Sequence, residues 1–178
     1  GTADTTYTLT QSISNESTCF HVKANNVTLD CSGHTVDYAN ATASGGYGVN
    51  ITGVNSTTVK NCVFTQQNRS VQFATGVFVL NGNSSIIINN TVNSTANYSY
   101  GIVLMRSNFT NITANRINTT GNFSYAIGLA LSGSNNVTQN NITTRSGNNA
   151  YGINITSSGL NNIRGNSIST SGTSINYG

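Results

Sequence analysis

The sequence contains very few charged residues and no acidic residue beyond Asp37. Charged residues make up 6% of the 178 residues, and proline and tryptophan are absent. The only carboxylates belong to Asp4, Glu16, Asp30 and Asp37. Glycoside hydrolysis requires two carboxylates that flank one bond, and calcium sites are built largely from carboxylate oxygens. Neither kind of site can be assembled beyond residue 37, so we expect no catalytic residues and interpret Glu16, Asp30 and Asp37 as turn and cap residues.

Long apolar segments and dense basic clusters are also missing. The longest apolar run, residues 126–131, is far shorter than the roughly 20 residues that span a bilayer. The chain begins at Gly1 without a signal peptide, which we interpret as a mature or trimmed chain. Seven basic residues give a net charge of +3 but are scattered, and no nucleic-acid-binding motif is present. We therefore predict neither membrane insertion nor a nucleic-acid partner.

One unit recurs through most of the chain. Its clearest copy is Tyr100-Gly101-Ile102-Val103-Leu104, followed by a second apolar segment at 111–117. The equivalent first residues lie at 47, 75, 100, 125 and 151, with separations of 28, 25, 25 and 26 residues. A fixed period of this size indicates a repeat architecture.

The apolar pattern within each unit predicts the kind of repeat. Apolar and polar residues alternate, as in a β-strand with one buried face. Two further apolar columns follow, one of Val59, Ile88, Ile112, Val137 and Ile163 and one of Val63, Val92, Ile117, Ile142 and Ile168. Because no window shows sustained helical periodicity, we predict an all-β, single-stranded parallel β-helix of about six coils of 25–28 residues. Like residues would then stack about 4.8 Å apart.

A column of asparagines supports this prediction, because stacked amides can hydrogen-bond along the axis and asparagine tolerates a left-handed turn. The predicted ladder comprises Asn61, Asn90, Asn115, Asn140 and Asn166. The units resemble those of right-handed parallel β-helix proteins of the pectate-lyase-like and NosD-like type, and residues 26–36 resemble the first coil of many archaeal and bacterial surface proteins. The resemblance covers residues 19–178 and implies the fold, which hosts many functions. Residues 1–18 do not fit the period and are predicted to be a lead-in or cap.

The histidines and acids near the N-terminus form the only candidate metal cluster. Asp30, Cys31, His34 and Asp37 lie close in sequence, and the resemblance to NosD-like proteins implies a link to copper handling. Their spacing matches no dedicated metal motif. His21 and His34 also lack a nucleophile elbow that would complete a catalytic triad. We therefore predict no metal and no cofactor.

Three cysteines, Cys19, Cys31 and Cys62, allow one disulfide and leave one thiol. Cys31 and Cys62 occupy similar places in successive coils, which would bring their Cα atoms within disulfide range. Cys19 lies 12 residues before Cys31, about half a coil, and a bridge across the thin first coil is the alternative that we favour slightly. The remaining cysteine is predicted to be a buried thiol, with an intermolecular bond as the alternative.

Seventeen N-x-S/T sequons predict secretion and N-glycosylation, since glycans would hydrate a surface that lacks charge. An Asn-, Ser- and Thr-rich β-helix also generates sequons by chance. Asn26 and Asn136 flank buried strands and are expected to be poorer acceptors. The predicted acceptors are Asn15, Asn40, Asn55, Asn68, Asn83, Asn93, Asn97, Asn108, Asn118, Asn122 and Asn154.

Together these features predict a non-catalytic, secreted structural protein that forms a filament, sheath or surface layer from copies of itself. Tyr177 and Gly178 begin another coil without a cap, and an open β-edge is a template for further pairing. The alternative is a carbohydrate-binding or adhesion module that uses the column Tyr100, Tyr125 and Tyr151. A polysaccharide lyase-like enzyme is a remote alternative. An ice-binding surface is disfavoured because no regular threonine array is present.

Overall fold

The computed structural model describes residues 1–41, 45–145 and 148–172, which form three parallel β-sheets. Sheet A contains β1 (Thr6–Thr8), β4 (Thr28–Asp30), β7 (Thr58–Lys60), β10 (Ile86–Ile88), β13 (Asn111–Thr113), β16 (Asn136–Thr138) and β19 (Asn162–Arg164). Sheet B contains β2 (Ile13–Ser14), β5 (Thr35–Asp37), β8 (Val63–Gln66), β11 (Thr91–Ser94), β14 (Arg116–Thr119), β17 (Asn141–Arg145) and β20 (Ser167–Ser171). Sheet C contains β3 (Phe20–Val22), β6 (Gly46–Thr52), β9 (Ala74–Leu80), β12 (Tyr100–Met105), β15 (Tyr125–Ala130) and β18 (Tyr151–Thr156).

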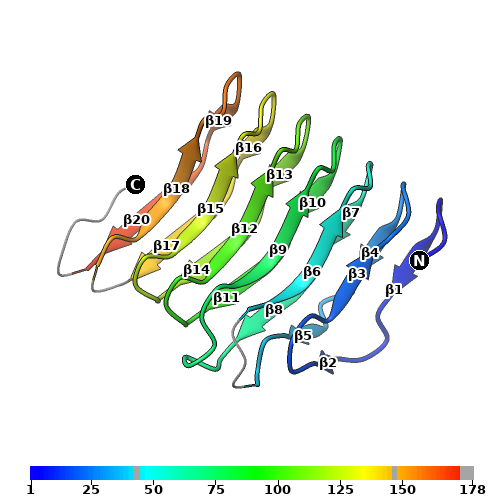
Figure 1. The fold of residues 1–178 in the computed structure, drawn as a ribbon, viewed down its shortest axis with the longest axis horizontal. Coiled ribbons are helices and arrows are strands. Elements are labelled where there is room, and N and C mark those ends of the chain that lie inside the picture. Colours follow the sequence, from blue (N-terminus) through cyan, green and yellow to red (C-terminus); the bar gives the residue numbers. More distant parts are fainter. Residues whose placement is uncertain (42–44, 146–147, 173–178) are drawn as a thin grey trace.

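The coils contribute strands to the sheets in the order A, B, C, and each strand from β1 to β17 pairs in parallel with the equivalent strand of the next coil. Figure 1 shows the coils stacked along the long axis, with the N-terminus at one end and the last described strands at the other. The described residues contain no helix. The predicted parallel β-helix is therefore confirmed.

The strand register corrects two members of the predicted apolar columns. Ile87, not Ile88, pairs with Val59 and Ile112 in sheet A and is fully buried. Phe64, not Val63, pairs with Val92 in sheet B. In both strands neighbouring residues are apolar, so alternation alone did not show which one points inward. A shift of one residue exchanges the buried and exposed faces of a strand, and the turn before each strand decides the register.

Residues 1–18, predicted as a lead-in or cap, supply strands of the solenoid. Strand β1 pairs with β4 and places Tyr7 beside Leu29, while β2 pairs with β5 and places Ile13 beside Val36. The sheet pairing therefore starts at Thr6. Sequence periodicity missed these strands because Thr and Ser occupy most of their positions.

The glycine in the recurring Tyr-Gly pair has a packing role. A Cβ atom added to Gly101 would lie 2.4 Å from the carbonyl oxygen of Ala126 and 2.5 Å from Ile117. Gly48 and Gly76 occupy the same column and would make similarly close contacts. In these three coils the inner side of the sheet C strand therefore approaches the next coil too closely for a side chain, which explains the glycine there.

Candidate functional site

A column of buried asparagines connects successive coils in the turn between sheets A and B. Asn115, which is 1% exposed, donates from Nδ2 to Oδ1 of Asn140 at 3.0 Å and accepts from Nδ2 of Asn90 at 3.0 Å. Asn140 repeats this contact with Asn166 at 2.9 Å. Each of these Nδ2 atoms also donates to a backbone carbonyl of the preceding coil. Four of the five predicted ladder residues therefore form one hydrogen-bonded ladder.

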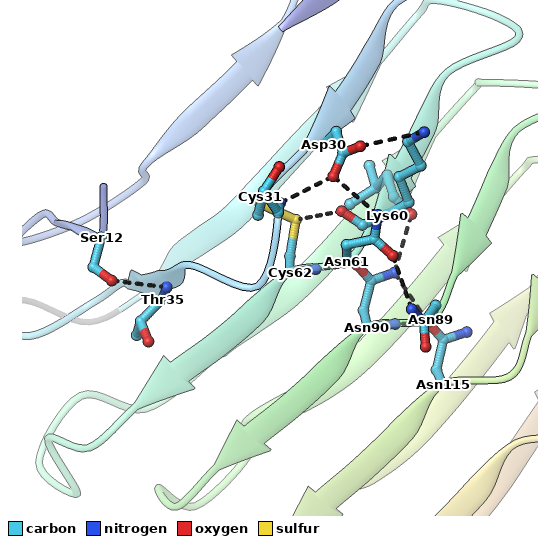
Figure 2. Close-up of a disulfide and its surroundings, with 12 residues drawn as sticks. Ser12, Asp30, Cys31, Thr35, Lys60, Asn61, Cys62, Asn89, Asn90 and Asn115 are labelled. Carbon is cyan, nitrogen blue, oxygen red and sulfur yellow. Dashed lines mark hydrogen bonds and ion pairs between the residues drawn. A yellow bond between two sulfur atoms is a disulfide. The ribbon is translucent and has the colours of Figure 1, made fainter. Parts of the chain in front are cut away.

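Asn61, the fifth predicted member, lies outside the ladder. Its backbone is left-handed, with φ of 55°, and its Nδ2 donates to Asp30 while its Oδ1 accepts from Asn89. The ladder position in that coil belongs to Cys62, whose backbone N–H donates to Oδ1 of Asn90 at 3.0 Å (Figure 2). In every later coil, too, the left-handed residue directly precedes the ladder asparagine. The prediction was wrong by one residue because it assigned both roles to the same position.

A disulfide joins Cys31 to Cys62 and occupies the ladder position in the two coils that precede Asn90 (Figure 2). The Cα atoms of the two cysteines are 4.7 Å apart, close to the spacing of adjacent strands. The favoured Cys19–Cys31 pairing was wrong. A half-coil separation places Cys19 at a different corner of the coil, whereas residues one full coil apart lie directly above one another. A covalent link therefore continues the column of amide hydrogen bonds.

Cys19 is a free, half-buried thiol. Its Sγ donates to the carbonyl oxygen of Asp37 at 3.3 Å, and it packs against the core. Burial, with a smaller contribution from the charge of Asp37, raises the pKa of the thiol to about 11. At neutral pH the thiol is therefore protonated and a poor nucleophile. This geometry agrees with the predicted buried thiol.

The acidic side chains make structural contacts in the first coils. Asp30 accepts hydrogen bonds from Asn61 Nδ2 and the Ser32 backbone N–H, and its Oδ2 lies 3.3 Å from Nζ of Lys60. The hydrogen bond from Asn61 contributes most to lowering the pKa of Asp30, followed by the bond from Ser32, with Lys60 adding to them. Asp37 accepts from Asn40 Nδ2 at 3.1 Å. Both residues end a strand, β4 or β5, and the bond from the Ser32 N–H to Asp30 is a turn contact, whereas Asp37 also accepts from Ser14 and Thr65 of the neighbouring coils.

The candidate metal cluster does not assemble within the described part of the chain. No group of three His, Cys, Asp or Glu side chains there could hold a metal ion. Cys31, one of its members, is in the disulfide, and Asp30 is engaged by Lys60. His21 and His34 lie on different sides of the first two coils, in β3 and in the turn before β5. These residues therefore give no support to a shared acid–base or metal site.

The asparagines divide into two structural classes. None of the 17 sequon asparagines is buried, whereas the four asparagines that are buried among the described residues lie in the internal columns and head no sequon. Asn26 and Asn136, expected to be hindered, are exposed because strand alternation turns the intervening valine inward. Asn15 and Asn55 are exposed among the predicted acceptors, and partly exposed are Asn40, Asn68, Asn83, Asn93, Asn97, Asn108, Asn118, Asn122 and Asn154.

Aromatic side chains stack on the outside of sheet C and beside it. The rings of Tyr100 and Tyr125 are stacked with centroids 4.7 Å apart, and Tyr151 meets Tyr125 edge-on at 5.4 Å. A second stack of Phe73, Tyr98 and Phe123 lies in the turns between sheets B and C. The predicted tyrosine column is therefore present. These contacts stabilise adjacent coils, and they also present a largely apolar surface.

A shallow hollow of about 290 Å³ adjoins the tyrosine column. Val103, Met105 and Ala130 line it, and Gly128 forms part of its floor. A Cβ atom on Gly128 would make only ordinary contacts, at 3.5 Å or more, so packing does not require glycine there. Asn154 places a polar side chain at the edge. The hollow could accommodate the apolar face of a small ring.

Two arginines on sheet B line a polar hollow of about 250 Å³. Arg116 and Arg145 lie on the adjacent strands β14 and β17, with Asn118 and Thr143 between them. Two isolated arginines do not form the extended basic stripe that is typical of nucleic-acid-binding surfaces. The prediction of no nucleic-acid partner stays a prediction.

Comparison with known proteins identifies the fold. A family model described as "Right handed beta helix region" matches residues 9–176. No curated protein and no solved structure gives a significant match. Among the described residues, no helix is long and apolar enough to cross a membrane.

Proposed function

The chain belongs to the right-handed β-helix family, and from this premise we propose that it is a non-catalytic, secreted protein that builds an extracellular filament, sheath or surface layer. The observation that carries the proposal is the continuous ladder from Cys31–Cys62 through Asn90 to Asn166, in which each coil bonds the next. The buried amides of Asn90, Asn115 and Asn140 are thus engaged between coils instead of facing a common site. Such a column favours a mechanical role for the fold.

Two observations support a location outside the cell. A structural disulfide is typical of proteins that fold in an oxidising compartment. The sequons occur only on asparagines that reach the surface, and the lateral surface carries few charges. N-linked glycans would hydrate that surface and hinder unwanted contacts between sheet faces.

Assembly of copies would use the same bonds that join coils within the chain. Strands β18, β19 and β20 each pair on one side with β15, β16 and β17. Another coil, from the same chain or another copy, would continue the three sheets and cover apolar side chains such as Ile163. The predicted assembly residues Tyr177 and Gly178 lie outside the described residues, so their role stays a prediction.

Electron microscopy of natively purified, non-reduced protein tests this proposal. The expected result is regular filaments or sheets whose axial repeat is a multiple of the strand spacing of about 4.8 Å. Discrete single particles over a range of concentrations would contradict it. Deletion of residues 151–178 is expected to abolish polymer growth while the remaining coils keep their circular dichroism spectrum. A truncated protein that still polymerises would rule out assembly through that end.

Carbohydrate binding is the second candidate, and the hollow beside Tyr100 and Tyr125 favours it. Sugar rings stack their apolar faces on aromatic side chains, and Asn154 could supply a hydrogen bond at the edge. Saturable binding on a glycan array should be lost in a Tyr100→Ala, Tyr125→Ala double variant and retained in Tyr47→Ala, whose ring stacks on Phe78 further along the sheet. Equal binding by both variants would contradict a site in this hollow.

A further inference from the structure

Five sequons adopt one shared conformation at two corners of the coil. In each, the asparagine is followed by a left-handed residue, with φ between 53° and 57°, and then by a buried Ser or Thr. Three of these asparagines stack between sheets C and A, and two stack between sheets B and C. The five turn sequons, as we call them, begin at Asn55, Asn83, Asn108, Asn97 and Asn122.

The hydrogen bonding of these asparagines involves only one end of the carboxamide. Oδ1 of Asn83 accepts from the backbone N–H of Asn108 at 2.8 Å, and Oδ1 of Asn97 accepts from the N–H of Asn122 at 2.8 Å. The other three make the same bond at 2.7 to 3.0 Å. Within the described ranges, none of the five Nδ2 atoms has a hydrogen-bond partner. The internal ladder asparagines differ because both ends of their amides are bonded.

The hydroxyl side of the sequon gives a second observation. Thr57, Ser85 and Thr110 are 0% exposed, and their hydroxyls have no hydrogen-bond partner among the described residues. A hydroxyl buried without a partner is destabilising. Val27 fills the same place in the preceding coil, where the equivalent asparagine, Asn25, heads no sequon, and the Val27 carbonyl accepts from the Thr58 N–H as the carbonyl of Thr57 does from Ile86. The fold itself therefore does not require a hydroxyl here.

In the described part of the chain, buried hydroxyls without a hydrogen-bond partner also occur in sheet B. Ser94, Thr119 and Thr144 stack at the inner end of sheet B and are also buried without partners in the described structure. None of them is the hydroxyl residue of a sequon. A buried hydroxyl therefore points to modification only together with an outward asparagine two residues before it, and the turn sequons of Asn55, Asn83 and Asn108 combine both.

We propose that the five turn sequons carry N-linked glycans and that these glycans are attached before the coils close. This inference rests on the proposed secreted function and assigns its modification sites. N-glycosylation requires the Ser or Thr hydroxyl two residues after the asparagine. In the folded chain Thr57, Ser85 and Thr110 are inaccessible, as are Ser99 and Ser124, which are also 0% exposed. The transferring enzyme therefore has to meet these sites in an open chain.

The transfer step needs an activated donor, an oligosaccharide linked to a lipid through phosphate. The bond between Nδ2 and the sugar C1 forms as the bond between C1 and the phosphate oxygen breaks. The phosphate leaves with the bonding electrons, and Nδ2 loses one proton. The Oδ1 atom takes no part, so the hydrogen bond from the next coil can still form after glycosylation. Folding then closes over the hydroxyl while the glycan stays outside.

The decisive experiment compares folded and unfolded acceptor. Unglycosylated protein is prepared in two forms, one folded with its disulfide intact and one reduced and unfolded. Each form is incubated with a microsomal oligosaccharyltransferase and its lipid-linked donor, and glycopeptides are quantified by mass spectrometry. Asn15 is the internal control because both Asn15 and Ser17 are exposed, and Asn15 Oδ1 accepts from the Ser17 N–H at 2.9 Å. We expect Asn15 to react in both samples and Asn83 to react at least about tenfold more slowly in the folded one, since a packed turn must open first. Equal rates at Asn83 would overturn the inference.

Variants that remove the sequon hydroxyl test whether it serves glycosylation or the stability of the fold. Thr57→Val is expected to abolish glycosylation at Asn55 in a secretory host and to leave the denaturation midpoint unchanged or higher, because Val27 shows that valine fits. Ser85→Ala should act in the same way on Asn83. A stability loss in unglycosylated Thr57→Val protein would show that the hydroxyl serves the fold, which contradicts the inference.

Microscopy of the same material distinguishes this inference from the proposed function. If secreted protein forms filaments while its turn sequons carry no glycan, the proposed glycan sites are wrong and the structural role stands. Discrete particles with occupied turn sequons would overturn the structural role alone.

Discussion

Replacing one residue of the internal ladder tests whether these bonds hold the coils together. Asn115 lies in the middle of the ladder and is 1% exposed. Its side chain makes five hydrogen bonds, two to Asn90, one to Asn140 and two to the carbonyls of Ile87 and Thr113. Asn115→Ala removes all five and leaves the buried N–H of Asn90 without its acceptor.

The expected loss of stability follows from these contacts. Each net hydrogen bond contributes about 0.5–1.5 kcal/mol, and a buried group left without a partner costs about 1–3 kcal/mol. Because Asn140 Oδ1 keeps a bond from the Asn115 backbone N–H, only part of the network is orphaned. We therefore expect Asn115→Ala to lower the free energy of unfolding by about 4 kcal/mol.

A matched exposed asparagine provides the control. Asn136 also stacks between two asparagines, with Nδ2 donating to Asn111 at 2.8 Å and Oδ1 accepting from Asn162 at 3.2 Å, but it lies on the outer surface. Asn136→Ala is expected to change the free energy of unfolding by less than about 0.5 kcal/mol. Guanidinium denaturation followed by far-ultraviolet circular dichroism, with the disulfide intact, measures both variants. Equal midpoint shifts would refute the view that the buried ladder stabilises the coils.

Three further predictions concern the disulfide, the close contact in sheet C and the free thiol. Replacing Cys31 and Cys62 together by Ala should lower the free energy of unfolding by about 3 kcal/mol. Replacing both by Asn should recover part of this loss, because the two asparagines would extend the ladder. Equal denaturation midpoints for the two double variants would contradict the equivalence of cysteine and ladder positions. Gly101→Val should lower the free energy of unfolding by about 2 kcal/mol or more because its side chain would meet Ala126, while Gly128→Ala should have little effect. Burial raises the pKa of Cys19 from 9.0 to about 11, so between these values the native protein retains a proton that the unfolded protein loses. The free energy of unfolding should therefore fall as pH rises from about 9 to about 11. A Cys19→Ala variant with the same pH dependence would refute this cause.

Most of the fold followed from periodicity, because one unit repeated at a nearly constant spacing leaves few alternatives. The alternation around Ile102 and Leu104 and the recurrence of Asn90, Asn115 and Asn140 were sufficient to predict stacked coils. Periodicity could not resolve neighbours of similar polarity, which is why Ile88 and Val63 were chosen in place of the buried Ile87 and Phe64.

The site features depended more on geometry than on residue type. The sequons are visible in the sequence, but the burial of the hydroxyls of Thr57 and Thr110 is not. Nor does the sequence show that the aromatic rings of Tyr47 and Phe78 stack, since tyrosine and phenylalanine occupy different positions of their units. These relations arise between coils, where residues far apart in the sequence lie side by side.

The sequence by itself determined the parallel β-helix, its coil length and most of the residues that fill its core. The tertiary structure alone decided the strand register, the Cys31–Cys62 pairing and the place of Asn61 outside the ladder. The physical reason is that hydrophobic alternation specifies which kind of strand forms, whereas a single left-handed turn residue determines which side chain comes to lie above which. A shift of one residue in the pairing of a strand moves the side chains of that strand to the opposite face.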